Sequence, residues 1–130
     1  MSAPLILIVE DDPNSRKLLR DVLGAVGYKT LEAETAEEGI RLAQESVPAL
    51  ILMDIRLPGI SGIEALRQLR QDARTRKIPV VAVTASVMQS QKAQALDAGF
   101  DALEHKPVTI SALLGTVRRI LARNPLSETT

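Results

Sequence analysis

Several kinds of residue are scarce or missing in this 130-residue chain, and each absence excludes a class of site. The chain has no cysteine, which excludes disulfides and thiolate metal sites. Tyr28 and Phe100 are the only aromatic residues, too few and too scattered to form a stacking platform for nucleic-acid bases. No apolar run approaches about 18 residues, so the sequence predicts no membrane-spanning helix.

An excess of charge of one sign is also missing. The 16 basic and 16 acidic residues give a formal net charge of zero, and no run of Lys or Arg stands out. Nucleic-acid binding therefore has no electrostatic support. The first residues, Met-Ser-Ala-Pro, lack the charged segment and cleavage site of a secretory signal. We expect a cytoplasmic protein with neither nucleic-acid nor membrane partners.

The length suits one domain with a core of its own. Apolar residues make up 45% of the chain and charged residues 25%, which is ordinary for a soluble globular protein. We expect one domain over residues 1–123, followed by a short polar tail over residues 124–130.

Three short apolar runs each end at a polar residue that could carry chemistry. Residues 5–9 lead into Glu10 and Asp11, residues 49–53 lead into Asp54, and residues 80–83 lead into Thr84. Runs of this length, bounded by turn residues such as the Leu-Pro-Gly after Arg56, are typical of strands buried on both faces. Residues 28–33 and 101–104 are mixed or short and predict two weaker strands.

Amphipathic helices are predicted between these strands. A first helix begins at Pro13 with Asp12 as its cap and ends before Gly27. Capping boxes at Thr35–Glu38 and Ser61–Glu64 open the second and third helices. A fourth helix over residues 87–98 has a thin apolar stripe and should be the loosest, whereas the last helix, after Pro107, is strongly amphipathic. The first helix carries a stripe formed by Leu18, Leu19, Val22, Leu23 and Val26.

Five strands alternating with five helices predict an α/β fold, a doubly wound parallel sheet with helices on both faces. The three apolar strands belong in the middle and the two mixed strands at the edges. Right-handed crossovers then give the flavodoxin-like order 2-1-3-4-5, with a switch point between the first and third strands.

This order brings together the carboxyl ends of the first and third strands, and with them Glu10, Asp11 and Asp54. Such a set of hard oxygen ligands suits Mg²⁺. Thr84 adds a hydroxyl and Lys106 an ammonium, so the site could hold a phosphoryl group and neutralise its charge. Each residue alone has a structural alternative: the acidic pair favours a helix start, Asp54 caps a turn, and Lys106 is solvated.

The same residues give the chain a resemblance to a known family. Ile6-Leu7-Ile8-Val9-Glu10-Asp11, the segment from Met53 to Gly62, Val83-Thr84-Ala85 and Lys106-Pro107 resemble the motifs of two-component response-regulator receiver domains. The resemblance covers about residues 4–123. Within the family the chain looks most like the DivK-like single-domain receivers, through Leu-Ile-Leu-Met-Asp-Ile and Ile-Pro-Val-Val-Ala-Val-Thr-Ala.

The resemblance implies a role for each matching residue. Asp54 would accept a phosphoryl group from a phosphohistidine, and Thr84 and Lys106 would contact that group. Asp11 and Asp54 would bind Mg²⁺ directly and Glu10 through water, with the backbone carbonyl of Arg56 as a further ligand. The Lys106–Pro107 bond would be cis.

Partners follow from the resemblance as well: a sensor histidine kinase or histidine phosphotransfer protein, a downstream protein target, and a possible homodimer. The protein would be a stand-alone phosphoacceptor in signalling or phosphorelay rather than a classical enzyme. Output is expected from the face of the fourth helix, fifth strand and last helix, or alternatively from the first helix. Leu103 stands where many receivers have a switch aromatic, which puts that coupling in doubt.

Two other functions remain as alternatives. Phosphatases of the haloacid dehalogenase type also use an Asp nucleophile with Mg²⁺, but they resemble one another in an Asp-x-Asp motif, and Arg56 stands at its second position. A non-phosphorylated receiver-like interaction module would be expected to lose one of the chemical groups, and none is lost. His105, the only histidine, is interpreted as an ordinary edge-strand residue.

Overall fold

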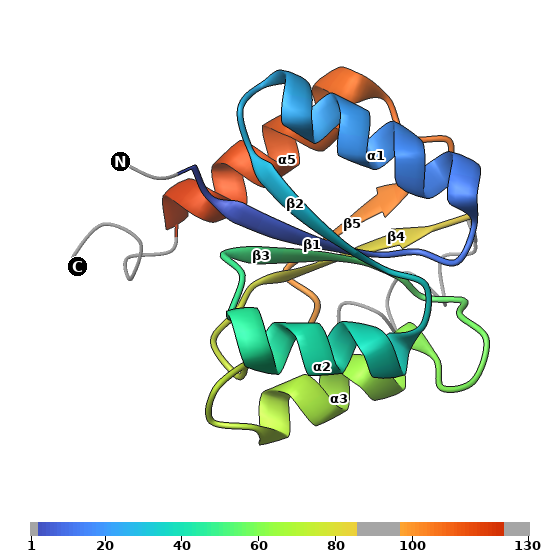
Figure 1. The fold of residues 1–130 in the computed structure, drawn as a ribbon, viewed down its shortest axis with the longest axis vertical. Helices are drawn as coiled ribbons and strands as arrows, with labels where there is room; N and C mark the ends of the chain where they lie inside the picture. The colour runs from blue at the N-terminus through green and yellow to red at the C-terminus, as the bar shows by residue number, and fades with distance from the viewer. Residues whose placement is uncertain (1–2, 86–96, 124–130) are drawn as a thin grey trace.

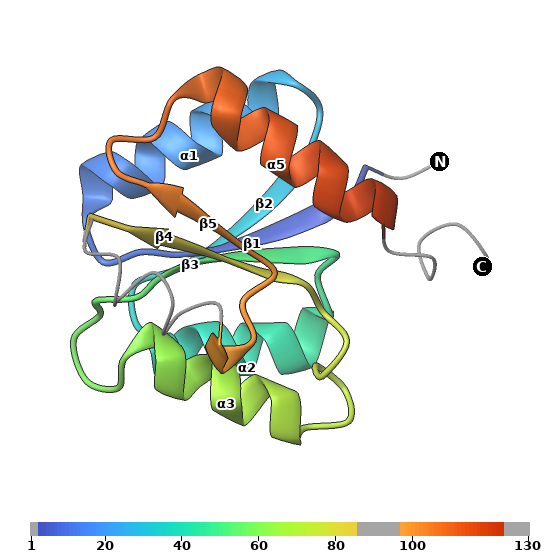
Figure 2. The same ribbon diagram turned by 180° about the vertical axis from the view of Figure 1, so that it is seen from behind.

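The computed structural model describes residues 3–85 and 97–123, which form a five-stranded sheet between two layers of helices (Figures 1 and 2). The strands are parallel and lie in the order β2-β1-β3-β4-β5. Their bounds are β1 Leu5–Val9, β2 Lys29–Ala33, β3 Leu50–Asp54, β4 Val80–Thr84 and β5 Ala102–His105. The predicted fold class and strand order are confirmed.

Helices cover both faces of the sheet. Helices α1 (Pro13–Ala25) and α5 (Ile110–Arg123) lie on one face, and α2 (Ala36–Ser46) and α3 (Gly62–Gln71) lie on the other (Figure 1). The fourth helix predicted over residues 87–98 falls almost wholly outside the described residues, as does the predicted tail over 124–130. Within the described part of the chain, no helix is both long and apolar enough to cross a membrane.

The period-two alternation of the strands divides the core into two clusters. Ile6 and Ile8 face α1 and α5, whereas Leu7 and Val9 face α2 and α3. Strands β3 and β4 alternate in the same way, and every residue of both is buried. This double burial explains why their sequences read as continuous apolar runs.

The predicted helix starts are borne out in most details. Asp12 caps α1 by accepting from the Ser15 amide at 2.9 Å, with Pro13 in the first turn. Thr35 caps α2 by accepting from the amide of Glu38, but the Glu38 carboxylate accepts from the amide of Glu34, so the return bond of this capping box falls one residue before the cap.

Two local predictions need correction. At α3 the Ser61 hydroxyl accepts from the amide of Glu64, but the Glu64 carboxylate pairs with Arg67 at 2.7 Å instead of returning to the helix start. Only half of that capping box therefore forms. In α1 only part of the predicted stripe is buried: Leu18 is 45% and Val26 is 43% exposed.

Candidate functional site

The alternation of the strands places three chemical groups on the same side of the sheet. Glu10 follows Ile6 and Ile8 in phase, and Asp54 follows Leu50 and Leu52, so both side chains belong to the face covered by α1 and α5. Lys106 follows β5 in the same phase as Ala102, which also packs on that face. Strands β1 and β3 are neighbours, and only β4 separates β3 from β5, so these residues meet at one edge, the carboxyl end of the sheet.

The predicted acidic cluster forms at this edge. One carboxylate oxygen each from Glu10, Asp11 and Asp54 lies within 4.8 Å of the others. Glu10 and Asp54 are buried, whereas Asp11 is exposed at the start of the β1–α1 turn. The site therefore has a buried floor and an open rim, and an ion or phosphoryl group could enter from the side of Asp11.

Lys106 lies between the two buried carboxylates. Its Nζ donates a 2.9 Å hydrogen bond to Asp54 Oδ2 and lies 2.6 Å from Glu10 Oε1. The contact with Glu10 is a charge contact rather than an aligned hydrogen bond, because Oε1 has no partner of hydrogen-bond geometry among the described residues. One ammonium thus compensates two carboxylates at once.

The titration of the site reflects this arrangement. Burial raises the pKa of Glu10, and the nearby charge of Asp54 adds to the rise, although the contact with Lys106 and the hydrogen bond from the Asp12 amide oppose it. Burial alone would lower the pKa of Lys106, but its contacts with Glu10 and Asp54 outweigh burial and raise it. Lys106 is therefore a fixed cation at neutral pH.

Asp54 is held by its own backbone as well as by Lys106. The amide of Arg56 donates to Asp54 Oδ1 at 3.0 Å, which orients the carboxylate at the start of the turn. Gly62 allows the first turn of α3 to pack onto this segment: a Cβ there would lie 2.4 Å from the Asp54 carbonyl oxygen. The Gly62 amide donates to the carbonyl of Ile55 at 2.9 Å, closing the loop.

Thr84 ends β4 and is buried beside this edge. Its carbonyl accepts from the amide of Lys106 at 2.8 Å, so the backbone of Lys106 is fixed by the neighbouring strand. The Lys106–Pro107 peptide bond is cis, as the resemblance implies. Leu103 packs against the core cluster on the α2–α3 face, and His105 lies exposed at the end of the edge strand β5.

The three carboxylates fit a hard divalent cation. Mg²⁺ is six-coordinate with ligands at about 2.0–2.1 Å, so opposite ligands lie about 4.2 Å apart. The separation of the three oxygens, within 4.8 Å of one another, is comparable with that span. It suits the usual magnesium site, in which one or two carboxylates bind directly and waters complete the shell.

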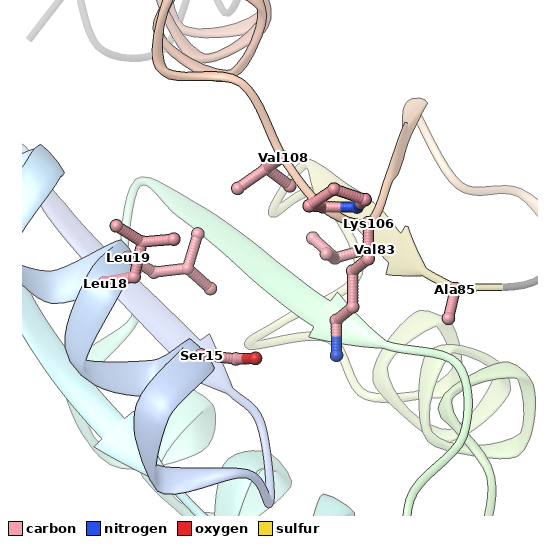
Figure 3. Close-up of a pocket in the computed structure, with 8 residues that line it drawn as sticks. Ser15, Leu18, Leu19, Val83, Ala85, Lys106 and Val108 are labelled. Carbon is pink, nitrogen blue, oxygen red and sulfur yellow. The ribbon is translucent and has the colours of Figure 1, made fainter.

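An apolar pocket of about 340 Å³ opens beside Lys106. Figure 3 shows it between α1, which contributes Ser15, Leu18 and Leu19, and the segment that follows β5. Val83 and Val108 line it further, and Lys106 forms part of its wall. The exposed Leu18 at this pocket is the residue that the helical stripe wrongly placed in the core.

One residue near the site carried no signal in the sequence. Arg16 of α1 donates from Nη1 to the carbonyl of Glu10 at 3.0 Å, so it contacts the backbone of the acidic turn. A single arginine on a helix surface is not distinguishable by sequence from its neighbours Lys17 and Arg20. Its contact depends on how α1 sits against β2, which periodicity does not specify.

This sheet and site place the chain in a known class. The family described as response regulator receiver domain matches residues 6–118, and the chain belongs to that family. Among curated proteins it is 39% identical to the polar-differentiation response regulator DivK of Brucella ovis over 116 residues, which cover 89% of this chain and 94% of that protein. DivK of Brucella anthropi has the same identity and coverage.

Solved structures agree in fold. A putative response regulator from Chloroflexus aurantiacus superimposes with a TM-score of 0.90 and 31% identity, over 94% of this chain and all of that one. The receiver domain of a sensor histidine kinase from Pseudomonas aeruginosa PAO1 gives a TM-score of 0.87 and 29% identity, over 93% and 99% of the chains. That structure holds a magnesium ion coordinated in its active-site cleft.

Proposed function

We propose that this chain accepts a phosphoryl group on Asp54 from a phosphohistidine of a sensor kinase or phosphotransfer protein. The observation that carries the proposal is the cluster of Glu10, Asp11 and Asp54 with Lys106 across it. In the transfer, an Asp54 carboxylate oxygen forms a bond to phosphorus while the nitrogen–phosphorus bond breaks, and the imidazole leaves with that electron pair. The group then signals by partner binding or passes onward in a relay.

The residues around Asp54 have separate tasks in this proposal. Lys106 pairs with the phosphoryl oxygens, and Thr84 donates its hydroxyl to them. Asp11 and Asp54 hold Mg²⁺ directly, Glu10 holds it through water, and the Arg56 carbonyl completes the protein ligands. Bound there, Mg²⁺ supplies positive charge that offsets the charge on the phosphoryl oxygens during transfer.

The acceptor is tested by phosphorylation with acetyl phosphate and Mg²⁺ followed by intact-mass measurement. Wild type should gain one phosphoryl group, and Asp54→Asn should gain none. Asp12→Asn is the matched control, because Asp12 is an adjacent carboxylate that caps α1 through Ser15 and asparagine caps equally well. A label that persists in Asp54→Asn, or that is lost in Asp12→Asn, would contradict the assignment.

We infer further that the phosphodonor protein docks over the apolar pocket beside Lys106. Leu18 is 45% exposed at its rim, and an exposed apolar group beside a reactive cleft favours a protein partner. Leu18→Glu should slow transfer from a phosphorylated histidine kinase about tenfold or more while leaving labelling by acetyl phosphate unchanged. Val26→Glu, 43% exposed near the other end of α1, is the control. Equal effects of both substitutions would refute the docking site.

A further inference from the structure

Arg16 joins the acidic turn after β1 to strand β2. Besides the hydrogen bond from Nη1 to the Glu10 carbonyl at 3.0 Å, its Nε lies 3.2 Å from Glu32 Oε1, and its Nη2 lies 3.7 Å from Glu34 Oε1. The side chain is only 17% exposed. One guanidinium therefore holds a backbone carbonyl, a carboxylate of the neighbouring strand (Glu32) and the carboxylate of the residue that follows this strand (Glu34).

The Glu10 carbonyl needs this donor because the ladder between β1 and β2 stops here. The Glu10 amide donates to the carbonyl of Ala33 at 3.0 Å, and β2 ends at Ala33. In a strand the N–H and C=O of one residue point to the same edge, so the Glu10 carbonyl is directed past the last residue of β2. Glu10 is buried, so a donor from the protein takes the place of the missing strand.

We propose that Arg16 is a positioning residue for the acidic site, an inference that rests on the function proposed above. The Glu10 carbonyl belongs to the peptide unit that joins Glu10 to Asp11. Because that unit is planar, fixing the carbonyl also fixes the positions of the Asp11 nitrogen and Cα, the atoms from which the Asp11 side chain starts. The Arg16 side chain contacts Glu10 only through its backbone carbonyl. Within the described residues, no hydrogen bond or ion pair joins it to the carboxylates of Glu10, Asp11 or Asp54.

The positioning comes from directed hydrogen bonds rather than from charge alone. Glu32 and Glu34 lie beside the guanidinium and offset its charge, so its field at the acidic cluster is small. The planar fork of arginine presents donors to several acceptors at fixed angles, which a lysine ammonium does not. A lysine at position 16 would keep the positive charge but not the planar guanidinium, so it should not keep the acidic turn in position.

The test is a Mg²⁺ titration of ¹⁵N-labelled protein, followed through the backbone amides of Asp11 and Asp12. Arg16→Met should raise the Kd for Mg²⁺ about tenfold, the effect expected when an outer partner of a ligand is removed. Arg16→Lys should weaken binding nearly as much. Arg20→Met is the matched control, because Arg20 also pairs with Glu32, at 3.2 Å, yet has no contact with the Glu10 carbonyl, and it should change the Kd less than about twofold.

A second measurement does not depend on the metal. The Glu10 amide bonds to the Ala33 carbonyl and the Asp12 amide bonds to Glu10 Oε2, so both amides report on the turn. In metal-free protein, amide exchange at these two positions should be faster in Arg16→Met than in Arg20→Met.

The outcomes separate this inference from the proposed function. If wild type bound Mg²⁺ and Arg16→Met bound it equally well with unchanged exchange, the positioning role would be wrong. Equal weakening by Arg20→Met would overturn it too, because the effect would then come from Glu32. If wild type bound no Mg²⁺, the proposed function would fail, and the exchange comparison alone would decide on Arg16. If Arg16→Met did not fold, Arg16→Lys would serve in both arms.

Discussion

Replacing Lys106 with methionine tests the electrostatic design of the site directly. The substitution keeps an unbranched apolar stem of similar length but removes the ammonium that lies 2.6 Å from Glu10 and 2.9 Å from Asp54. Glu10 and Asp54 are 1% and 6% exposed, so water does not replace the lost cation. Two close, buried carboxylates would remain with nothing between them.

The loss of folding stability in Lys106→Met can be estimated from how buried these groups are. Breaking a buried ion pair by removing one partner costs about 3–5 kcal/mol. The Lys106 side chain is itself 23% exposed, so we take a value below that range, about 2–3 kcal/mol at pH 7. For a domain of this size the melting temperature falls about 3–4 °C per kcal/mol, which gives a decrease of about 6–12 °C.

The loss should depend on pH with a defined sign. Burial already raises the pKa of Glu10 above 4.5, and without Lys106 it should rise further. Between the unfolded and folded pKa values the native state binds more protons than the unfolded state, so stability falls as the pH rises through this window. The deficit of Lys106→Met should therefore be largest at neutral pH and shrink on acidification toward about pH 5.

The assay is thermal unfolding of metal-free protein followed by circular dichroism between pH 5 and pH 8. Lys77→Met is the control, since Lys77 is exposed and forms no ion pair within the described residues, yet the change in net charge is the same. The reasoning would be refuted if Lys106→Met and Lys77→Met had the same melting temperature at pH 7. A deficit that grew on acidification would refute it equally.

Three further predictions concern the same edge of the sheet. Asp54→Asn should stabilise the metal-free protein by about 1 kcal/mol because it removes one of the crowded charges. Mg²⁺ at about ten times its Kd should stabilise wild type by about 1.4 kcal/mol. If neither change moved the melting curve, the three carboxylates would not share a site. Gly62→Ala should lower the free energy of unfolding by about 2–3 kcal/mol, because the new Cβ would meet the Asp54 carbonyl. Denaturant unfolding measures this loss, with Gly115→Ala as the control because a Cβ at residue 115 meets no atom within 4 Å. Gly39→Ala would place a Cβ 2.7 Å from Val9 Cγ2, so it should destabilise wild type but be tolerated with Val9→Ala, with a coupling of about 1 kcal/mol in a double-mutant cycle.

Most of the site could be predicted because its residues lie at the carboxyl ends of buried strands. A strand buried on both faces must be apolar until it leaves the core, so the first polar residue marks its carboxyl end. Glu10, Asp54 and Thr84 are the residues at which β1, β3 and β4 stop being apolar, and the structure places them there. Strand order then follows from which runs are wholly apolar, and it brings those ends together.

The buried surfaces of the helices were harder to predict. An apolar stripe shows which side of a helix faces the core, but not how many of its residues the core covers. Five apolar residues share one side of α1, yet only Leu19 and Leu23 are fully covered. How far α5 lies from α1 decides whether Leu18 is core or rim, and no local pattern records that distance. The capping box at Ser61 formed only in part because the Glu64 carboxylate pairs with Arg67, one turn further along the same helix.

Long cationic side chains complete the site, and their contacts depend on how the strands and helices are placed in the fold rather than on local sequence. Lys106 has one ammonium with three N–H donors, so on the proposed mechanism it can stay beside Glu10 while another donor turns to a phosphoryl oxygen on Asp54. On the same proposal, the carboxylates that make the metal-free site costly to fold are also the groups that would hold the cation, and one of them, Asp54, would accept the phosphoryl group. A bound cation would therefore relieve repulsion that the sheet order imposes, and the stability of the site would be coupled to its occupancy by the metal.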